Sequence, residues 1–423
     1  MSETCCIVGA GPGGAILALL LARQGIKVTL LEAHEDFDRD FRGDTIHPSV
    51  LNLMDEIGLA DRLLQLRHSR VHTARFSTPD GPIILADFRR IETKFPYIMI
   101  TPQSEFLKFI ADETQRYPSF QLLMGASAQE LIEEDGIVRG VRYRSGDDWH
   151  EIRAALTVGA DGRSSRIRRL AGFEPIKTSP PMDVLWFRIP RESTDPEGIL
   201  AYFGRGHGLV LLDRLTEWQV GFIILKGSFS QIRAAGLEAL RGTISELLTE
   251  FPDRIKHLQD WKQVAVLSVE SSRVPQWYKP GLLLIGDAAH VMSPVGGVGI
   301  NYAIQDAVVA ANVLTDPLKA VSQSLRAASA LTPSPVVQRG GAQAVSVDYL
   351  REVQRQREFP TRAIQWIQSQ VQKRVIGAAL RSDRPLQIPW PIRLLLHVPL
   401  IRDIPARIIA HGIKRVRLEN RLR

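Results

Sequence analysis

The stretch Gly9–Gly14, with the sequence GAGPGG, decides the fold of the N-terminal part of this chain. It follows the apolar run Thr4–Val8 and precedes a longer apolar run, Ala15–Gln24. A short strand-like segment then follows at Lys27–Leu31. This order predicts a buried strand, a turn, a helix and a second strand. Because a helix connects the two strands, we expect them to lie parallel in one sheet, as a βαβ unit of about 30 residues.

The glycines of this turn have the spacing that a bound dinucleotide requires. Gly9 permits the tight turn, Gly11 lets a pyrophosphate approach the backbone, and Gly14 lets the helix pack closely on the strand. The helix that begins beside Gly13 offers free amides and a positive dipole end to phosphates. Glu32 ends the second strand, 18 residues after Gly14, where a carboxylate can accept hydrogen bonds from a ribose diol.

A second glycine-rich stretch spans Gly286–Asn301 and begins with the sequence GDAAH, directly after the apolar segment Gly281–Ile285. Asp287 lies just past this predicted strand, where an acid can bind a polyhydroxyl chain. The turn that starts at Pro294 leads into a helix predicted to begin near Gly299. Such a turn presents backbone amides to an electron-rich group.

A third stretch, Gly159–Ser165 with the sequence GADGRSS, follows the apolar strand Ala155–Val158. Taken alone, it is more typical of a simple turn than of a binding site. Together, the three stretches resemble the class A flavoprotein monooxygenases, the para-hydroxybenzoate hydroxylase-like family that includes ubiquinone-biosynthesis hydroxylases. The resemblance covers roughly residues 4–315 and depends on the order and spacing of three separate motifs.

The resemblance implies FAD as the cofactor, with its pyrophosphate at the first glycine turn and its adenosine ribose at Glu32. Asp161 and Gly162 match the family's Asp-Gly motif, which serves FAD and is implicated in NAD(P)H binding. Asp287 matches the acid that binds the ribitol chain. No second dinucleotide fingerprint for NADPH or NADH is present, as in the family, so the sequence does not locate the reductant.

The resemblance also places the segment from Pro294 to Asn301 under the isoalloxazine ring. Gly299 begins the predicted helix, and Ile300 and Asn301 would offer backbone amides to the pyrimidine edge of the flavin. This placement is physically sensible, because reduced flavin is anionic and a helix N-terminus stabilises negative charge. Pro294 is therefore a candidate for positioning groups near the reactive end of the flavin.

Three further candidates have a structural alternative or a less direct match. Arg42 matches the family arginine near the FAD pyrophosphate and the incoming nicotinamide cofactor. Gln103 occupies a position where the family commonly has Arg or Gln contacting flavin, but it is equally typical of a helix N-terminus. His47 can reach the active site if Arg42 does, and a helix-entry role before Pro48 is at least as well supported. We expect His290, within the second motif, to be structural.

The predicted fold class is α/β. It comprises an FAD-binding Rossmann-like domain with a parallel sheet, an inserted mixed or antiparallel substrate sheet, and a C-terminal helical region. We expect the FAD-binding domain at residues 1–174 and 276–319, and the substrate-binding sheet at 175–275. Residues 320–345, rich in Ala, Ser, Gln and Pro, are expected to form a loop or linker, and 346–423 a basic helical region.

Within the inserted segment, Val184–Ile189, Gly208–Leu212 and Gln219–Leu225 predict antiparallel strands, and Ala234–Phe251 predicts one helix. The glycine-dense run Gly204–Gly208 is expected to be a hairpin turn, since no helix follows it. This sheet should form one wall of the substrate pocket. Its aromatic residues suit the pocket and the core equally well: Trp186, Phe187, Tyr202, Phe203 and Phe222.

Charge and cysteine content exclude several classes of protein. The net charge is +7, but residues 351–423 alone contain 16 Lys and Arg against 5 Asp and Glu. The body is therefore slightly acidic and has no basic stripe for a nucleic acid. The only cysteines, Cys5 and Cys6, are adjacent in a predicted strand, which excludes a disulfide framework and fits a reducing, cytoplasmic compartment.

The basic C-terminal stretch allows two interpretations. It can be a peripheral membrane anchor, which would suit a lipophilic substrate, or a helical layer packed on the flavin domain. We favour the helical layer, because the prolines between Pro389 and Pro405 prevent one long amphipathic helix.

The resemblance implies a hydroxylase that uses NADPH or NADH and dioxygen to oxygenate an aromatic or lipophilic small molecule through a flavin 4a-hydroperoxide. The chemistry is the cofactor's, which explains why the chain needs no metal site or nucleophilic triad. The alternatives are an FAD-dependent halogenase or prenyl-lipid reductase, and a non-enzymatic escort-type protein. A halogenase would require a lysine and a Trp-x-Trp-x-x-Ile segment after the first motif, which this chain lacks.

Overall fold

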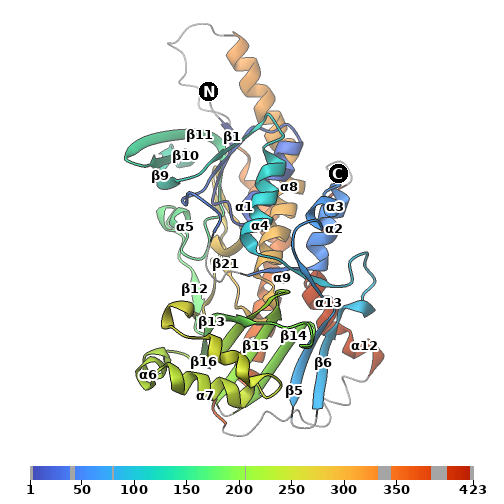
Figure 1. Ribbon diagram of the computed structural model, residues 1–423. Helices are drawn as coiled ribbons and strands as arrows, with labels where there is room; N and C mark the ends of the chain where they lie inside the picture. Colours follow the sequence, from blue (N-terminus) through green and yellow to red (C-terminus); the bar gives the residue numbers. More distant parts are fainter. Residues whose placement is uncertain are drawn as a thin grey trace.

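The computed structural model describes the chain in six segments: residues 3–38, 43–78, 81–204, 206–331, 344–382 and 398–419. Arg42 therefore lies outside the described residues, as do residues 332–343. Figure 1 shows an upper part built on the N-terminal sheet, a lower part built on a second large sheet, and long helices that run beside both.

The upper sheet has the strand order β19-β20-β11-β1-β2-β8. Its central strand β1 pairs in parallel with both neighbours, and within this strand order β19 alone joins antiparallel. The hairpin β9–β10 extends from the long strand β11. The strands are β1 (Glu3–Val8), β2 (Val28–Leu31), β8 (Phe120–Leu123), β9 (Ala126–Glu134), β10 (Ile137–Ser145), β11 (Asp148–Gly159), β19 (Tyr278–Lys279) and β20 (Leu282–Leu284).

Helices cover the upper sheet because its central strands are apolar on both faces. The helix α1 (Pro12–Arg23), which starts at the predicted glycine turn, packs between α4 (Gln103–Thr114) and α8 (Gly299–Leu331). In this parallel arrangement, β1, β11 and β20 end at one edge of the sheet. The three glycine-rich stretches of the sequence follow these strands, so all three meet at that edge.

The lower sheet has the order β17-β13-β16-β15-β14-β5-β6 and is antiparallel except where β14 meets β5. Its last two strands come from residues 73–87, far before the predicted inserted segment. Its strands are β5 (Thr73–Thr78), β6 (Gly81–Asp87), β13 (Met182–Pro190), β14 (Ile199–Gly204), β15 (His207–Asp213), β16 (Glu217–Leu225) and β17 (Ala265–Ser268). The β14–β15 pairing confirms the predicted hairpin turn, since Gly204 pairs with His207.

Two helices, α6 (Phe229–Ala235) and α7 (Leu237–Leu247), lie on the outer face of the lower sheet (Figure 1). The prediction of one helix over this stretch was wrong, because Gly236 has a φ of 94° and breaks it. The core on this face includes Phe187, Trp218 and Phe222.

Shorter elements connect the two large sheets. Two three-stranded sheets consist of β3 (Thr45–Ile46), β7 (Ile98–Ile100) and β4 (Ser69–Val71), and of β12 (Ile176–Thr178), β18 (Ser271–Arg273) and β21 (His290–Val291). The short helices are α2 (Pro48–Glu56), α3 (Ala60–Leu63), α5 (Arg166–Leu170), η1 (Phe88–Arg90), η2 (Pro252–His257), η3 (Trp261–Gln263), η4 (Gly286–Ala288) and η5 (Val295–Gly297).

The helix α8 differs from the prediction. Residues 320–331, which we expected to be a loop, continue this helix to Leu331. The composition rich in Ala and Gln suggested low complexity, yet Ala and Gln favour a helix. Leu318 and Val321 anchor this part of α8, since both side chains are buried.

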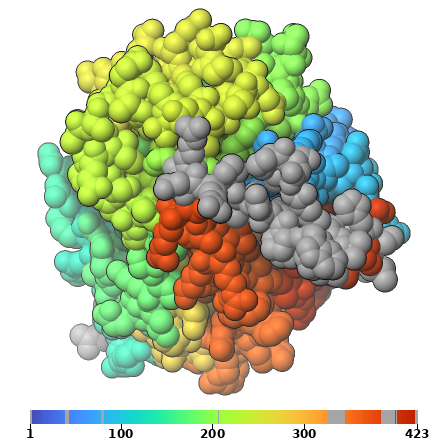
Figure 2. All heavy atoms as spheres, turned by 90° about the horizontal axis from the view of Figure 1, so that it is seen from below, coloured from blue at the N-terminus to red at the C-terminus, as the bar shows by residue number. Residues whose placement is uncertain are grey.

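The C-terminal part packs as a helical layer. It comprises α9 (Val347–Val371), the π-helix η6 (Gln372–Ile376), α10 (Gly377–Ala379), α12 (Pro399–Arg402) and α13 (Ile404–His411). Figure 2 shows these orange and red residues beside the green and yellow lower sheet. Ala406 and Ala410 of α13 are fully buried against β4, β6 and η1. In the described parts of the chain, every helix is too short or too polar to cross a bilayer.

Candidate active site

The first glycine turn has no room for side chains at two of its positions. A Cβ atom on Gly9, whose φ is 102°, would lie 2.5 Å from the Ala160 carbonyl oxygen. A Cβ on Gly14 would lie 2.0 Å from the carbonyl oxygen of Gly9. At Gly11 the nearest of the surrounding atoms would be 4.0 Å away, so the space in front of this residue is open. This pattern fits a turn whose backbone is approached by a phosphate group.

Glu32 is held beside this turn. Its carboxylate accepts hydrogen bonds from the Ala10 amide at 2.9 Å and from the His34 amide at 3.1 Å, and its side chain is buried. These contacts orient the carboxylate at the end of β2. Because a carboxylate can accept several hydrogen bonds, they are compatible with a ribose hydroxyl as a further partner.

The Asp-Gly stretch is packed directly against the first turn through Ala160. The Asp161 carboxylate accepts hydrogen bonds from the Arg166 amide at 2.7 Å, the Ile167 amide at 3.0 Å and the Ser165 hydroxyl. Burial raises the pKa of Asp161, although these hydrogen bonds oppose the shift. Asp161 therefore caps the free amides at the N-terminus of α5, and Gly162 follows it with a φ of 80°.

Arg168 connects this stretch to the second motif, a role that the sequence did not reveal. Its buried guanidinium donates to the carbonyl oxygens of Ala288 at 3.0 Å, Asp287 at 3.3 Å and Arg163 at 2.7 Å. The backbone around Asp287 is thus fixed relative to α5. The only clue in the sequence is the position of this arginine three residues after the helix-capping Ser165.

The first and second motifs meet at Ala303 in the first turns of α8. A Cβ on Gly13 would lie 3.1 Å from the Ala303 carbonyl oxygen, and a Cβ on Gly286 would lie 3.0 Å from the Ala303 Cβ. Glycine at both positions therefore allows α1 and η4 to approach α8. The two motifs, 272 residues apart in the chain, form one continuous site.

The segment Gly43–His47 lies along the loop from Pro294 to Asn301. A Cβ on Gly43 would be 3.1 Å from Ile300 Cδ1, and one on Gly297 would be 3.0 Å from Thr45 Oγ1. The Thr45 hydroxyl donates to the Gly297 carbonyl oxygen at 3.2 Å. The backbone next to Arg42 is therefore at this loop.

His47 lies at the start of α2 and beside the loop from Pro294 to Asn301. It precedes Pro48 at the start of α2, and its amide donates to Asn301 Oδ1 at 3.0 Å. Its ring is fully buried with Nε2 near Gly297, and Nδ1 lies 2.7 Å from the Ile409 carbonyl oxygen. Burial lowers the pKa of His47 to about 4, so the ring is neutral at pH 7 and Nδ1 carries the donated proton.

His290 belongs to a buried network with Asp306 of α8 and Arg357 of α9. The His290 Nε2 atom lies 2.6 Å from Asp306 Oδ2, and Arg357 Nε donates to Asp306 Oδ1 at 2.7 Å. The Gly286 amide also donates to Asp306 at 3.0 Å. Burial raises the pKa of Asp306, but His290 and Arg357 more than offset this and hold it below its usual value.

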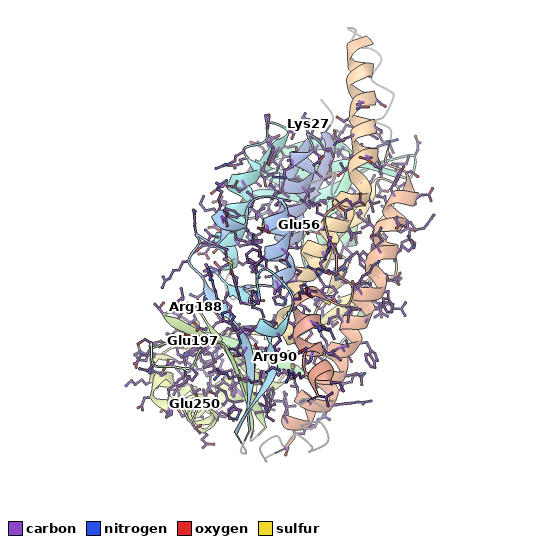
Figure 3. The ribbon with its side chains drawn as sticks, turned by 90° about the vertical axis from the view of Figure 1, so that its right-hand side faces the viewer. Lys27, Glu56, Arg90, Arg188, Glu197 and Glu250 are labelled. Carbon is purple, nitrogen blue, oxygen red and sulfur yellow. The ribbon has the colours of Figure 1, made fainter. Side chains whose placement is uncertain are left out.

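Gln103 begins α4, and its backbone amide hydrogen-bonds the Asp44 carboxylate. Burial raises the pKa of Asp44 to about 6, against the opposing effect of Arg214, whose Nε lies 3.6 Å away. Arg188 of strand β13, labelled in Figure 3, also lowers this pKa. Asp44 and Arg214 thus form a polar junction between the two sheets, which the sequence analysis missed.

Strand alternation separates the aromatic residues of the lower sheet. Phe187, Tyr202 and Phe222 belong to the core under α7. Trp186 and Phe203 point to the opposite face, where they pack against a buried apolar cluster that includes Val184. Val295 of the glycine-rich loop and Val371 of α9 pack against the same cluster. Trp186 lies flat on its sheet, since a Cβ on Gly221 would be 2.9 Å from its ring.

A family model described as an FAD binding domain matches residues 2–339. The chain belongs to this FAD-binding family. It is 32% identical over 318 residues to the 6-methylpretetramide 4-monooxygenase of Streptomyces rimosus, a match that covers 74% of this chain and 75% of the relative. It is 27% identical to the pentachlorophenol 4-monooxygenase of Sphingobium chlorophenolicum, over 71% of this chain and 56% of that protein.

A solved structure has the same fold. The crystal structure of a probable FAD-dependent monooxygenase from Pseudomonas aeruginosa superimposes with a TM-score of 0.71 at 19% identity, over 90% of this chain and 97% of the other. The comparisons confirm the predicted fold class, the FAD cofactor and the enzyme class, an FAD-dependent monooxygenase. The open space at Gly11, the placed Glu32 carboxylate and the positive-φ glycines of the loop fit this cofactor.

Proposed function

We propose that this flavoprotein hydroxylates an aromatic small molecule bound between the Trp186 face of the lower sheet and the loop from Pro294 to Asn301. The observation that carries the proposal is that Trp186, Phe203 and Val295, all partly buried, pack against the same apolar cluster, where the two parts of the molecule meet. An aromatic ring suits a wall built from aromatic and aliphatic side chains. Two relatives have names that specify aromatic substrates, in agreement with this class.

FAD, when bound, supplies the chemistry by accepting hydride from NADPH or NADH and activating dioxygen. The chain holds the cofactor along the edge of the upper sheet. In this proposal the backbone amides at Gly11, Gly13 and Gly14 bind the pyrophosphate, and Glu32 binds the adenosine ribose. Asp287 is proposed to bind the ribitol chain.

At the reactive end, we assign the amides of Gly299, Ile300 and Asn301 to the pyrimidine edge of the flavin. They begin the 33-residue helix α8, whose N-terminus favours negative charge. The neutral ring of His47 adds no positive charge here, so the helix and loop amides supply the stabilisation. Pro294 and Val295 contribute apolar surface that excludes water from the substrate side.

Arg42 is proposed to contact the FAD pyrophosphate and the incoming nicotinamide cofactor. The support is the position of its neighbour Gly43 against Ile300. Asp161 and Gly162 lie on the other side of the first glycine turn, within reach of the same part of the cofactor. Gln103 is proposed to contact FAD through its half-buried side chain.

The test is to purify the full chain, measure its bound flavin, and follow NADH and NADPH oxidation with phenols, quinolones and polycyclic aromatic compounds. The expected result is a yellow protein whose reductant oxidation rises with an aromatic compound that also gains one oxygen atom. Product analysis by mass spectrometry separates hydroxylation from unproductive peroxide release. The proposal fails if the flavin-loaded protein oxygenates none of these compounds.

A further inference from the structure

The buried face of α9 and η6 carries four glutamines that point to the flavin-binding part. We term these four residues the amide ladder: Gln354, Gln365, Gln368 and Gln372. Each is at most 8% exposed. A helix ordinarily buries an apolar face, since an unpaired buried amide costs free energy. Four buried glutamines on one face therefore need specific partners. Figure 3 shows α9 beside α8 along the length of the molecule.

The partners lie within residues 272–295, and for Gln354, Gln365 and Gln368 they include backbone groups of this segment. Gln354 donates to the Pro275 carbonyl oxygen at 2.8 Å and accepts from the Trp277 amide at 2.9 Å. Gln365 donates to the carbonyl oxygens of Ser272 at 2.9 Å and Val291 at 3.0 Å. Gln354 thus binds the segment that follows β18, and Gln365 binds β18 and β21, the strand directly before the flavin loop.

Gln368 reaches the loop itself. Its amide nitrogen donates to the carbonyl oxygen of Ser293 at 2.9 Å and to that of Val295 at 2.7 Å, on either side of Pro294. Gln372 donates to the Ser293 hydroxyl. The side chain of Gln368 is only 3% exposed, so these two carbonyl groups point into the protein.

The direction of a carbonyl group sets the direction of the next amide. In a planar trans peptide the C=O and N–H bonds point in opposite directions, and the described chain contains only trans peptides. With the Val295 oxygen directed at α9, the Gly296 N–H is directed away from α9. On the other side of the loop, Thr45 and Asn301 donate to the Gly297 oxygen. Side-chain donors therefore hold the carbonyl oxygens of Val295 and Gly297 in this loop and that of Ser293 directly before it.

We infer that Gln368 is a positioning residue that fixes the peptide polarity of the flavin loop and thereby stabilises the reduced, anionic cofactor. The inference rests on the proposed position of the Pro294–Asn301 loop beside the flavin. Amides that are already oriented toward the flavin stabilise its negative charge without reorganisation. A carbonyl group that lost its donor and turned toward the flavin would destabilise that charge. The polarity of a loop within the family match is thus set by a helix that lies beyond residue 339.

The experiment compares Gln368→Met with Gln356→Met in the full-length protein with bound FAD. Met has nearly the length and helix propensity of Gln but donates no hydrogen bond. Gln356 is a matched control, because it lies on the same helix and donates to Glu352 within that helix. The readouts are the two-electron reduction potential of the bound flavin and the affinity for oxidised FAD.

Gln368→Met should weaken the binding of reduced FAD about tenfold more than that of oxidised FAD. This ratio corresponds to a fall in the two-electron potential of about 30 mV. Gln356→Met should leave the potential at the wild-type value. An unchanged potential in a Gln368→Met protein that binds FAD overturns the inference.

If Gln368→Met fails to fold, Gln372→Met provides the test, since it removes only the contact with the Ser293 hydroxyl. It should shift the potential in the same direction by a smaller amount. Ser293→Ala also removes the acceptor of the Val295 amide at 3.2 Å, so it should shift the potential at least as far, and adding Gln372→Met to it should cause no further shift. A wild-type potential in Gln372→Met then overturns the inference. None of these measurements needs a substrate, so they remain decisive even if no compound is hydroxylated.

Discussion

The first glycine turn and helix α9 serve the same site in opposite ways. At the turn, three glycines and one acid act through their own backbone or carboxylate, and their spacing is visible in the sequence. Along α9 and η6, the amide ladder and Arg357 act on residues 51 to 93 positions earlier in the chain. The comparison teaches that a local motif can be recognised from its spacing, whereas a support from a distant helix becomes visible only in three dimensions.

The largest effect is expected at the glycine turn. Gly14→Ala places a methyl group 2.0 Å from the Gly9 carbonyl oxygen, so α1 must move off β1. We expect the affinity for FAD to fall at least about a thousandfold, or the protein to fail to fold. The free energy of unfolding should fall by more than about 4 kcal/mol. Flavin content after purification and thermal unfolding measure this. The matched control is Gly242→Ala in α7, where a Cβ meets open space and the helix should gain slight stability.

Arg357→Leu tests whether a contact from α9 contributes as much to the stability of the protein as the glycine turn does. It leaves the buried Asp306 with His290 but without its guanidinium, and removing one partner of a buried ion pair costs about 3–5 kcal/mol. Since the pKa of Asp306 is below its usual value, its ion pairs add stability at neutral pH that is lost as pH falls through the folded pKa. Urea unfolding between pH 3 and pH 7 should show a weaker acid-dependent loss in the variant. Arg351→Leu, which removes an exposed pair with Asp348, should cost less than about 1 kcal/mol.

Asp44→Asn tests the polar junction between the sheets. Because burial raises the folded pKa of Asp44 to about 6, its ionisation costs stability that accumulates as pH rises from about 4 to above 6. The wild type should therefore lose up to about 3 kcal/mol over this range relative to the variant. Parallel unfolding curves at all pH values would contradict the assignment.

Trp186→Leu tests which face of the lower sheet binds the substrate. We expect the KM for an aromatic substrate to rise about tenfold, or about 1.4 kcal/mol, with little change in stability. Phe187→Leu, one position along β13, should instead lower the free energy of unfolding by about 1 kcal/mol and leave KM unchanged. Equal effects of both variants on KM would remove the distinction between the two faces.

The sequence predicted the βαβ unit, the antiparallel strands of the inserted segment and the helix after Gly299, because each has a local periodicity or turn signal. It did not predict that β5 and β6 complete the lower sheet, since strand partners far apart leave no local pattern. The break at Gly236 was missed because a single glycine is tolerated within many helices. Residues 320–331 continue the predicted helix although we expected a loop there, because composition was given more weight than helix propensity.

In the candidate site too, residues with a local sequence signal were predicted and residues that act across the fold were not. Positions such as Glu32 and Asp287 follow strands at a fixed spacing, so a motif is sufficient to propose them. Arg168, Asp44 and Gln368 act by reaching a carbonyl or carboxyl group on another element, and no spacing rule relates a glutamine on α9 to a loop some 75 residues earlier.

The position of the amide ladder near the end of the chain has a consequence for synthesis on the ribosome. Val295 is made 77 residues before Gln372, which at about 5–20 residues per second corresponds to roughly 4–15 seconds. During this interval the upper sheet can already assemble, while the loop still lacks the donors that orient its carbonyl groups. The flavin loop therefore gains its orienting donors long after its own residues have been translated.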